Sequence, residues 1–275
     1  MRTKRTLKMA IVYILLVVCA FIMVFPIVWV IFSSFKPAGE LFRWPPTLLP
    51  ADPTLENYAN ALSEGDFMLF FRNTFVVTVL ATILTVIINL MSGYVFAKYE
   101  FPGRGILFAI VLTTMMIPVE VIMIPVFKVI VATHMYDNLW GLIIPAIASP
   151  TAVFLIRQYY IGIPNDYMEA ARIDGASETG IFLRIMAPLA IPVISVLCIF
   201  SFMWRWNDYL WPKIVISSKA NYTIQLALAT FSGEFAVDWD SLLAMSVITM
   251  VPVLVIFLIF QKHIIGGITI AGVKG

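Results

Sequence analysis

Six apolar segments, each long enough to cross a lipid bilayer, constrain the fold of this chain more than any other feature. They cover residues of about 9–33, 70–97, 105–131, 137–160, 187–212 and 241–262. A transmembrane helix needs roughly 17–25 mostly apolar residues, and backbone groups inside lipid must find hydrogen bonds within helices or closed barrels. The pattern predicts an all-α integral membrane protein with six transmembrane helices. Prolines within these segments, among them Pro26, Pro118 and Pro192, favour kinked helices.

The composition agrees with a chain that lies mostly in lipid. It is 61% hydrophobic and 12% charged, whereas a soluble domain carries about 25% charged residues. The formal net charge of +2 is too small to indicate nucleic-acid binding. With no internal repeat, residues 1–275 are interpreted as a single transmembrane domain.

The N-terminus resembles a secretory signal because basic residues precede an apolar run. That run extends from Met9 to Phe32, about twice the length of a signal-peptide core, and no Ala-x-Ala cleavage site follows it. The segment is therefore predicted to be a retained transmembrane helix.

A polar insert at residues 161–186 separates the fourth and fifth apolar segments. Pro164, Asn165 and Asp166 favour the start of a helix, and Gly175 favours its end. A second helix is predicted to begin after Ser177-Glu178 and to lead into the fifth segment. Small and charged residues at 169–174 suggest a shallow surface, formed by Ala170 and Ala171 and ringed by Glu169, Arg172 and Asp174, on which another protein could dock. The alternative is an ordinary capped connector.

The placement of lysine and arginine predicts the orientation, because cytoplasmic loops carry an excess of these residues. With the N-terminus inside, eleven of the 18 Lys and Arg residues fall on the inner side and seven on the outer side. Both termini and the insert are therefore predicted to be cytoplasmic in a multi-pass membrane protein.

No catalytic or metal centre is predicted. Cys19 and Cys198 lie in apolar runs, and His134 and His263 have no partner at metal-ligand spacing. A stretch at 175–180 has the two glycines of a phosphate-binding loop, but Ile181 and Phe182 follow where Lys and Ser or Thr are required. The chain is therefore not expected to bind ATP itself.

Polar and aromatic residues near the end of the fifth segment are candidates for the path of a solute. Trp204, Asn207, Asp208 and Trp211 are spaced i, i+3, i+4 and i+7, which places them on one face of the predicted helix. A cavity or subunit contact is the interpretation for Asn207 and Asp208, with Arg205 either paired with Asp208 or extended outward. An aromatic belt at the lipid interface is the alternative, favoured for Trp206 and Trp211.

Glu120 and Asn89 are weaker candidates, for which a helix–helix hydrogen bond is the alternative. The hypothesis of an ion-coupled secondary transporter needs ion-coupling carboxylates, and only Glu120 and Asp208 are candidates for that role.

The insert resembles the "EAA" loop of ABC-importer permease subunits, which reads Glu-Ala-Ala, three residues, Gly, nine residues, Ile, one residue, Leu, Pro. The chain has Glu169-Ala170-Ala171, Gly175, Ile185 and Pro188 at these spacings, with Ala187 in place of Leu. The resemblance implies the type I ABC importer permease fold, with a coupling helix that docks on a separate ATPase. The residues that it assigns to coupling are Glu169, Ala170, Ala171, Asp174 and Gly175.

Other stretches resemble carbohydrate-importer permeases of the maltose-permease type. They are the tail at 266–275, the segment Trp44–Tyr58, the Ile-Pro pairs at 117–118 and 124–125, and Trp206-Asn207-Asp208. The resemblance implies uptake of sugars or oligosaccharides, with glycerol phosphate as the alternative cargo. In the resembling family the tail lies near the ATPase; a frayed end is the alternative.

The resemblance also implies the partners and the location. They are a second homologous permease, an ABC ATPase dimer that binds ATP and Mg²⁺, and an extracytoplasmic solute-binding protein. The expected location is the plasma membrane of a prokaryote. The candidate residues for the substrate pathway remain Trp204, Asn207 and Asp208.

Overall fold

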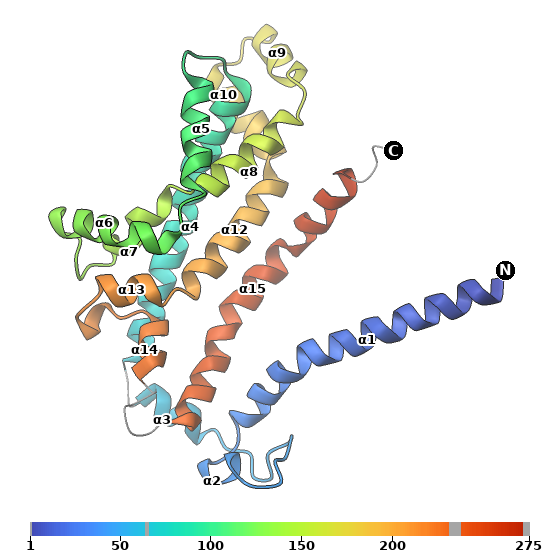
Figure 1. Ribbon diagram of the computed structural model, residues 1–275, viewed down its shortest axis with the longest axis vertical. Coiled ribbons are helices and arrows are strands. Elements are labelled where there is room, and N and C mark those ends of the chain that lie inside the picture. Colours follow the sequence, from blue (N-terminus) through green and yellow to red (C-terminus); the bar gives the residue numbers. More distant parts are fainter. Residues whose placement is uncertain (1, 64–65, 231–237, 272–275) are drawn as a thin grey trace. The chain divides into compact units, whose positions relative to one another are not determined.

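A computed structural model describes residues 2–63, 66–230 and 238–271, and within these ranges all regular structure is helical (Figure 1). Four helical stretches are long and apolar enough to cross a membrane. They are Lys8–Ser33 in α1 (Arg2–Ser33), α4 (Phe67–Lys98), Trp140–Ile161, and Trp239–Gln261 in α15 (Trp239–Ala271).

Two further helix pairs pass the same test but are sharply bent. The first joins α5 (Arg104–Thr114) to α6 (Val119–Ala132) at 105°, and the second joins Glu178–Leu189 to α12 (Ile191–Trp206) at 73°. The described chain therefore has four candidate spans, or up to six if each bent pair counts as one. The predicted all-α membrane fold is confirmed.

Three helices of the chain begin at or next to a proline. Pro118 immediately precedes α6, Pro150 opens α8 (Pro150–Ile161), and Pro192 lies in the first turn of α12. Proline lacks the N–H that an interior helical position donates, but it fits the first turn of a helix. The same chemistry that breaks one helix therefore begins the next.

The chain forms two compact units, of which the first comprises residues 1–68 and 227–251. Between α1 and α3 (Glu56–Ser63) its backbone is held by side chains around α2 (Ala38–Leu41). Asn57 donates to the carbonyls of Ser34 and Lys36, at 2.9 and 2.8 Å. The buried Lys36 ammonium donates to the Thr47 carbonyl and lies 5.0 Å from the centre of the Trp29 ring. Residues 34–58 are thus ordered by their own polar contacts.

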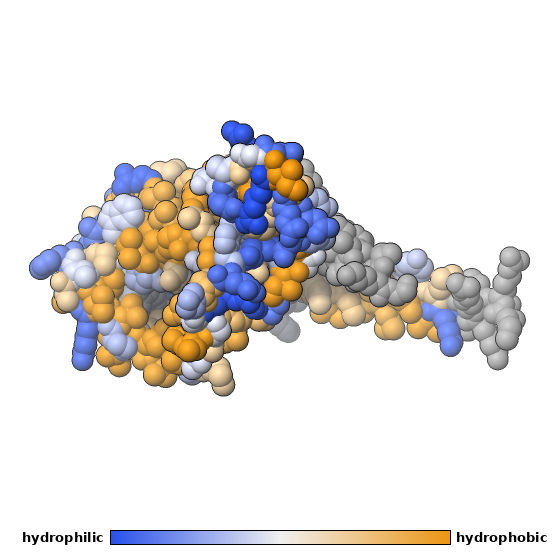
Figure 2. All heavy atoms as spheres, turned by 90° about the horizontal axis from the view of Figure 1, so that it is seen from above, coloured by the Kyte–Doolittle hydropathy of each residue, from blue (hydrophilic) through white to orange (hydrophobic). Residues whose placement is uncertain are grey.

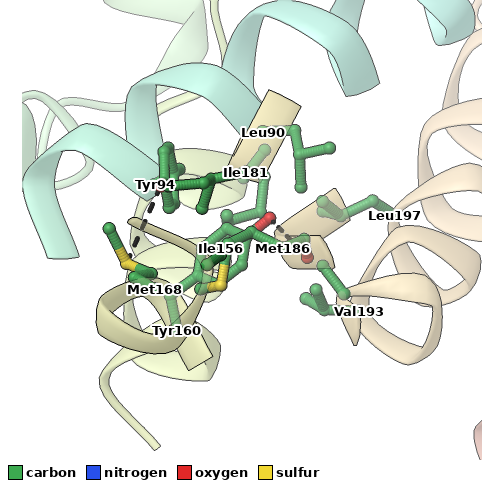
Figure 3. Packing of buried hydrophobic residues seen from close by; sticks show 12 residues of the cluster. Leu90, Tyr94, Ile156, Tyr160, Met168, Ile181, Met186, Val193 and Leu197 are labelled. Atoms are coloured by element: carbon green, nitrogen blue, oxygen red, sulfur yellow. Dashed lines mark hydrogen bonds between the residues drawn. The ribbon is translucent and has the colours of Figure 1, made fainter. Parts of the chain in front are cut away.

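The second unit comprises residues 69–226 and 252–275 and carries the polar insert. Its remaining helices are α7 (Trp140–Ile147), α9 (Asp166–Ile173), α10 (Glu178–Ile181), a π-helical turn (Phe182–Met186), α11 (Ala187–Leu189), α13 (Leu210–Val215) and a 3₁₀ turn (Lys219–Asn221); α14 (Ile224–Thr230) begins in this unit. A buried apolar cluster, which includes Leu90, Tyr160 and Met186, joins the insert to α4, α8 and α12 (Figure 3).

Candidate functional site: the polar insert

The first helix of the insert ends at a left-handed glycine. Gly175 has φ +79°, a conformation that costs residues with a Cβ atom about 1–2 kcal/mol. The Ala176 N–H donates to the Ala171 carbonyl (2.9 Å) and the Gly175 N–H to the Arg172 carbonyl (3.1 Å). This pair of bonds is the Schellman arrangement that closes a helix C-terminus. The predicted stop at Gly175 is confirmed.

The start of α9 is fixed differently from the prediction. Asn165 occupies the N-cap position, but its side chain makes no capping hydrogen bond. Its Oδ1 instead accepts from Lys98 Nζ at 2.8 Å, and the same ammonium donates to the Ile163 carbonyl. Since Lys98 is the last residue of α4, the beginning of the insert is tied to the end of a long helix.

One face of α9 is buried in the bundle. Met168 is 2% exposed and Ala171 6% exposed, and both belong to the cluster drawn in Figure 3. The Tyr94 hydroxyl lies 3.7 Å from the Met168 sulfur, in hydrogen-bond geometry. The prediction that Ala171 forms part of an outer docking surface is therefore wrong, because residues three apart share a helix face and Met168 already faces inward.

The opposite face of α9 is exposed and mixes charge with apolar surface. Glu169, Ala170 and Asp174 are exposed, as predicted for a docking surface. Ile173 is 87% exposed and was missed as a candidate. The inward pair of Met168 and Ala171 is the signal that could have found it, since Ile173 falls on the side away from both. In Figure 2, which views the structure of Figure 1 from above, hydrophilic residues gather over the insert.

An ion pair braces the turn between the two helices of the insert. Arg172 Nε donates to Glu178 Oε1 at 2.6 Å and Arg172 Nη2 to Oε2 at 3.1 Å, while the Tyr99 hydroxyl donates to Oε2. The bond from Arg172, and next that from Tyr99, lowers the pKa of Glu178 to about 2. The same pair raises the pKa of Arg172. Ser177 caps α10 by accepting from the Gly180 N–H at 3.1 Å, which confirms the predicted start of the second helix.

The second helix of the insert reaches α12 through a π-helical turn and a bend. Two tyrosines of α8 hold this connection, with the Tyr160 hydroxyl donating to the Met186 carbonyl (3.2 Å) and the Tyr159 hydroxyl to the Leu189 carbonyl (3.0 Å). Both bonds satisfy carbonyls close to Pro188 and the bend. The insert is therefore attached to the bundle at its start, at its turn and at its end.

The predicted face for a solute path does not exist as one helix. α12 ends at Trp206 and α13 begins at Leu210, so Trp204 and Trp211 belong to different helices. Asn207 Nδ2 donates to the Met203 carbonyl at 2.8 Å, and Asp208 Oδ1 accepts from the Trp211 N–H at 3.3 Å. Short polar side chains that bond nearby backbone compete with helix continuation, which explains the break.

The tryptophans of this stretch lie in different surroundings. Trp206 is fully buried. Its ring is stacked on that of Phe202, with 5.5 Å between the ring centroids, and lies edge-to-face with Phe71, with 5.4 Å between the centroids. The prediction that it belongs to an interfacial belt is therefore wrong. Trp204 is 78% exposed, and Trp211 Nε1 donates to the Gly141 carbonyl at 3.1 Å.

The two weaker candidates, Asn89 and Glu120, lie in different surroundings. Asn89 is buried and hydrogen-bonded between helices, as its alternative interpretation predicted, and Glu120 is exposed in the first turn of α6. Among the described residues, no three His, Cys, Asp or Glu side chains are grouped so that they could hold a metal ion. The last residues of the tail, 272–275, lie outside the described part of the chain.

Comparison with known proteins identifies the family. Residues 89–269 match the family described as "Binding-protein-dependent transport system inner membrane component". The chain is 42% identical over 255 residues to the arabinooligosaccharides transport system permease protein AraQ of Bacillus subtilis, covering 91% of this chain and 90% of that protein. It is 31% identical over 264 residues to the sn-glycerol-3-phosphate transport system permease protein UgpE of Pectobacterium atrosepticum, covering 93% and 94%.

A solved structure has the same fold. It is the crystal structure of a bacterial ABC transporter involved in the import of the acidic polysaccharide alginate, one chain of which matches with a TM-score of 0.86 and 24% identity, covering 95% of this chain and 98% of that one. The fold likeness extends over almost the whole chain, and the family match includes the entire insert. The chain therefore belongs to the family of inner membrane components of binding-protein-dependent transport systems.

Proposed function

We propose that this permease is the subunit of an ATP-driven ABC importer that moves sugars or oligosaccharides across the cell membrane into the cytoplasm. The relative at 42% identity is named for arabinooligosaccharide transport. The observation that carries the coupling part of the proposal is the two-faced α9, which packs Met168 and Ala171 into the bundle and leaves Ile173 87% exposed.

The exposed face of α9 fits a protein docking surface. Ala170 leaves room for close approach, Ile173 offers an apolar side chain that a partner could bury, and Glu169 and Asp174 provide charges that orient the contact. Few interface residues carry most of the binding energy, and they fill pockets on the partner. We assign Ile173 the role of the apolar anchor, with Glu169, Ala170 and Asp174 around it. Ala171 and Gly175 then act by shaping the helix.

The partner that this surface receives is the ATP-hydrolysing subunit of the importer. The chain itself lacks the Lys and Ser/Thr of a phosphate-binding loop after Gly180, so ATP and Mg²⁺ are bound by that subunit. A second homologous permease, an ATPase dimer and an extracytoplasmic solute-binding protein complete the assembly. The excess of Lys and Arg on one side supports a cytoplasmic position for the insert and both termini.

The attachments of the insert favour transmission of force. Lys98 holds its start, Tyr99 holds its turn through Glu178, and Tyr160 holds its end. When ATP binding closes the ATPase dimer, a body held at three points moves as a lever and displaces α12, to which it is joined by the chain. The switch from inward-facing to outward-facing is a domain movement of the hinge or shear type.

The experiment places a bulky side chain on the exposed face. In the complete importer reconstituted in vesicles, Ala170→Trp is expected to abolish the stimulation of ATP hydrolysis by the loaded binding protein. The matched control is Ala109→Trp, at an exposed alanine within the apolar helix α5, which should keep that stimulation. Normal stimulation in the Ala170→Trp importer would exclude α9 as the coupling surface.

Glycerol phosphate is the second candidate cargo, favoured by the 31% identity to a glycerol-3-phosphate permease. The two cargoes are separated by uptake of radiolabelled arabinooligosaccharides and of glycerol 3-phosphate by vesicles holding the complete importer with its binding protein. Uptake of the sugar alone supports the first proposal, and uptake of the phosphate ester alone replaces it.

A further inference from the structure

A helix break, made of two extended residues, interrupts one candidate span in its interior. α7 ends at Ile147 and α8 begins at Pro150, within the stretch Trp140–Ile161. Between them Ala148 and Ser149 are extended, with ψ of 106° and 104°. The last carbonyls of a helix have no partner within it, and lipid offers none, so such a break is tolerated only where neighbouring protein groups satisfy it.

Asn89 of α4 bridges the two sides of this break. Its Nδ2 donates to the Ile147 carbonyl at 2.8 Å, and its Oδ1 accepts from the Ser149 N–H at 3.1 Å. The side chain is 1% exposed. The one side-chain amide therefore supplies a donor to the Ile147 carbonyl and an acceptor to the Ser149 N–H, which lack helical partners at the break.

Arg205 of α12 holds the α7 side of the break. Its Nη2 donates to the Ala146 carbonyl and to Thr85 Oγ1 (2.9 Å), and its Nη1 donates to the carbonyl (3.1 Å) and hydroxyl of Ser201. Thr85 Oγ1 also donates to the Ala146 carbonyl at 3.1 Å. The guanidinium thus joins α12 to α4 and to the carbonyl end of α7, where the helix dipole favours a cation.

Among the described residues, the Arg205 guanidinium has no carboxylate oxygen within 4.0 Å and so forms no salt bridge. Of the two alternatives for Arg205, the salt bridge with Asp208 is not formed, and its hydrogen bonds to Thr85 and Ala146 replace the outward extension. The Arg205 Nε is buried without a hydrogen bond. A charge without a salt bridge inside a membrane bundle is costly and marks a functional position by default.

Arg205 lies on the helix that continues from the insert. After the π-helical turn and the 73° bend, α12 runs from Ile191 to Trp206, and Arg205 is next to its last residue. A displacement of the insert would therefore reach Arg205 along α12. From there it would reach α7 through the hydrogen bond of the Arg205 side chain to the Ala146 carbonyl.

We propose that Arg205 is a positioning residue for transport, which transmits the displacement of α12 to the half-helix α7 by holding the Ala146 carbonyl. The inference rests on the proposed function, because it takes the insert as the place where the ATPase acts. The planar fork of arginine binds Ser201 and Ala146 at once, whereas a lysine ammonium is a compact charge that does not reproduce this geometry.

The first test compares two Arg→Lys changes in the complete importer in vesicles. With Arg205→Lys, solute uptake per ATP hydrolysed is expected to fall by about fivefold or more, the size of an ordinary coupling effect, while stimulation of ATP hydrolysis persists. The control is Arg157→Lys, whose guanidinium contacts the Phe96 carbonyl (3.2 Å) and the Phe108 ring (4.1 Å) and not the break. An unchanged ratio for Arg205→Lys would overturn the proposal.

The second test follows the break itself. Ala148→Cys is introduced after Cys19→Ser and Cys198→Ser, and its reaction rate with a membrane-impermeant maleimide is measured without nucleotide and with ATP and vanadate. We expect the rate to depend on nucleotide, and the dependence to disappear when Arg205→Lys is added. If that double variant does not assemble, Thr85→Val replaces Arg205→Lys, with a loss in the same direction.

The outcomes separate the two proposals. A nucleotide-independent rate in the Ala148→Cys parent, or a nucleotide dependence that survives loss of the Arg205 contacts, overturns the role of Arg205. Undiminished stimulation in the Ala170→Trp importer overturns the coupling role of α9 instead, whatever the labelling shows.

Discussion

Arg172 and Glu178 join the two helices of the insert across the turn at Gly175, with two parallel hydrogen bonds of 2.6 and 3.1 Å. Paired bonds between a guanidinium and a carboxylate fix direction as well as distance. The Tyr99 hydroxyl donates to the same carboxylate. The last turn of α9 and the first of α10 are therefore held as one body.

This pair predicts a pH dependence of the insert. The pKa of Glu178 is lowered from 4.5 to about 2, by the bond from Arg172 and then that from Tyr99. A carboxyl whose pKa falls on folding stabilises the folded form above its unfolded pKa, and this contribution is lost as the pH falls through the folded pKa. We expect the turn to be held above pH 4.5 and to loosen as the pH falls toward about 2.

Hydrogen exchange of the amides at 175–178, compared between the parent and Glu178→Gln, measures this effect. The variant should exchange faster than the parent at neutral pH, and the difference should vanish near pH 2. High salt should reduce the difference, because the two side chains are 43% and 52% exposed and exposed charges are screened. Equal exchange at neutral pH would show that the pair does not hold the turn.

The backbone conformation of Gly175 predicts how substitutions at this residue change stability. A Cβ added at this residue would meet no heavy atom within 4 Å, yet its φ is +79°. Gly175→Ala should therefore lower stability by about 1–2 kcal/mol through the left-handed conformation. Gly175→Asn should lose less, since asparagine tolerates this region. Thermal unfolding in detergent measures both, and an alanine variant as stable as the asparagine variant would contradict the interpretation.

Local signals were enough to predict much of the insert. Gly175 and Ser177 marked the end of one helix and the start of the next because a left-handed glycine and a capping serine act through neighbouring backbone. Long apolar runs likewise predicted α1, α4 and α15. Each of these features depends on residues close together in the chain.

Features that depend on distant residues could not be predicted. Ala171 faces inward because Met168 enters a cluster built from α4, α8 and α12. Arg205 binds groups 59 and 120 residues away along the chain, and no local pattern names such partners. At Asn207 the error was different, since its short amide bonds to the Met203 carbonyl and ends the helix that the spacing argument assumed.

Gly93 of α4 lies close against α8, which predicts the effect of a larger side chain there. An added Cβ would lie 2.6 Å from Ile156 Cγ2 and 3.1 Å from the Arg157 backbone nitrogen. Because this backbone cannot yield without moving a helix, Gly93→Ala should cost about 1–3 kcal/mol as overpacking. The control is Gly105→Ala in α5, where nothing lies within 4 Å. Thermal unfolding of Gly93→Ala no lower than that of the control would show that the two helices separate easily.

Trp204 and Trp206, two residues apart on α12, predict opposite results on truncation. Trp206 is fully buried against Phe71 and Phe202, whereas Trp204 is 78% exposed. Trp206→Ala should lower the free energy of unfolding by about 3–5 kcal/mol, since it leaves a cavity in the bundle.

Trp204→Ala should leave stability within about 0.5 kcal/mol, the usual range for exposed positions. Thermal unfolding and uptake should be measured for both variants at matched expression. Loss of uptake by Trp204→Ala without loss of stability would support its place on the solute path. A stable, fully active Trp204→Ala importer would remove Trp204 from the candidate solute path.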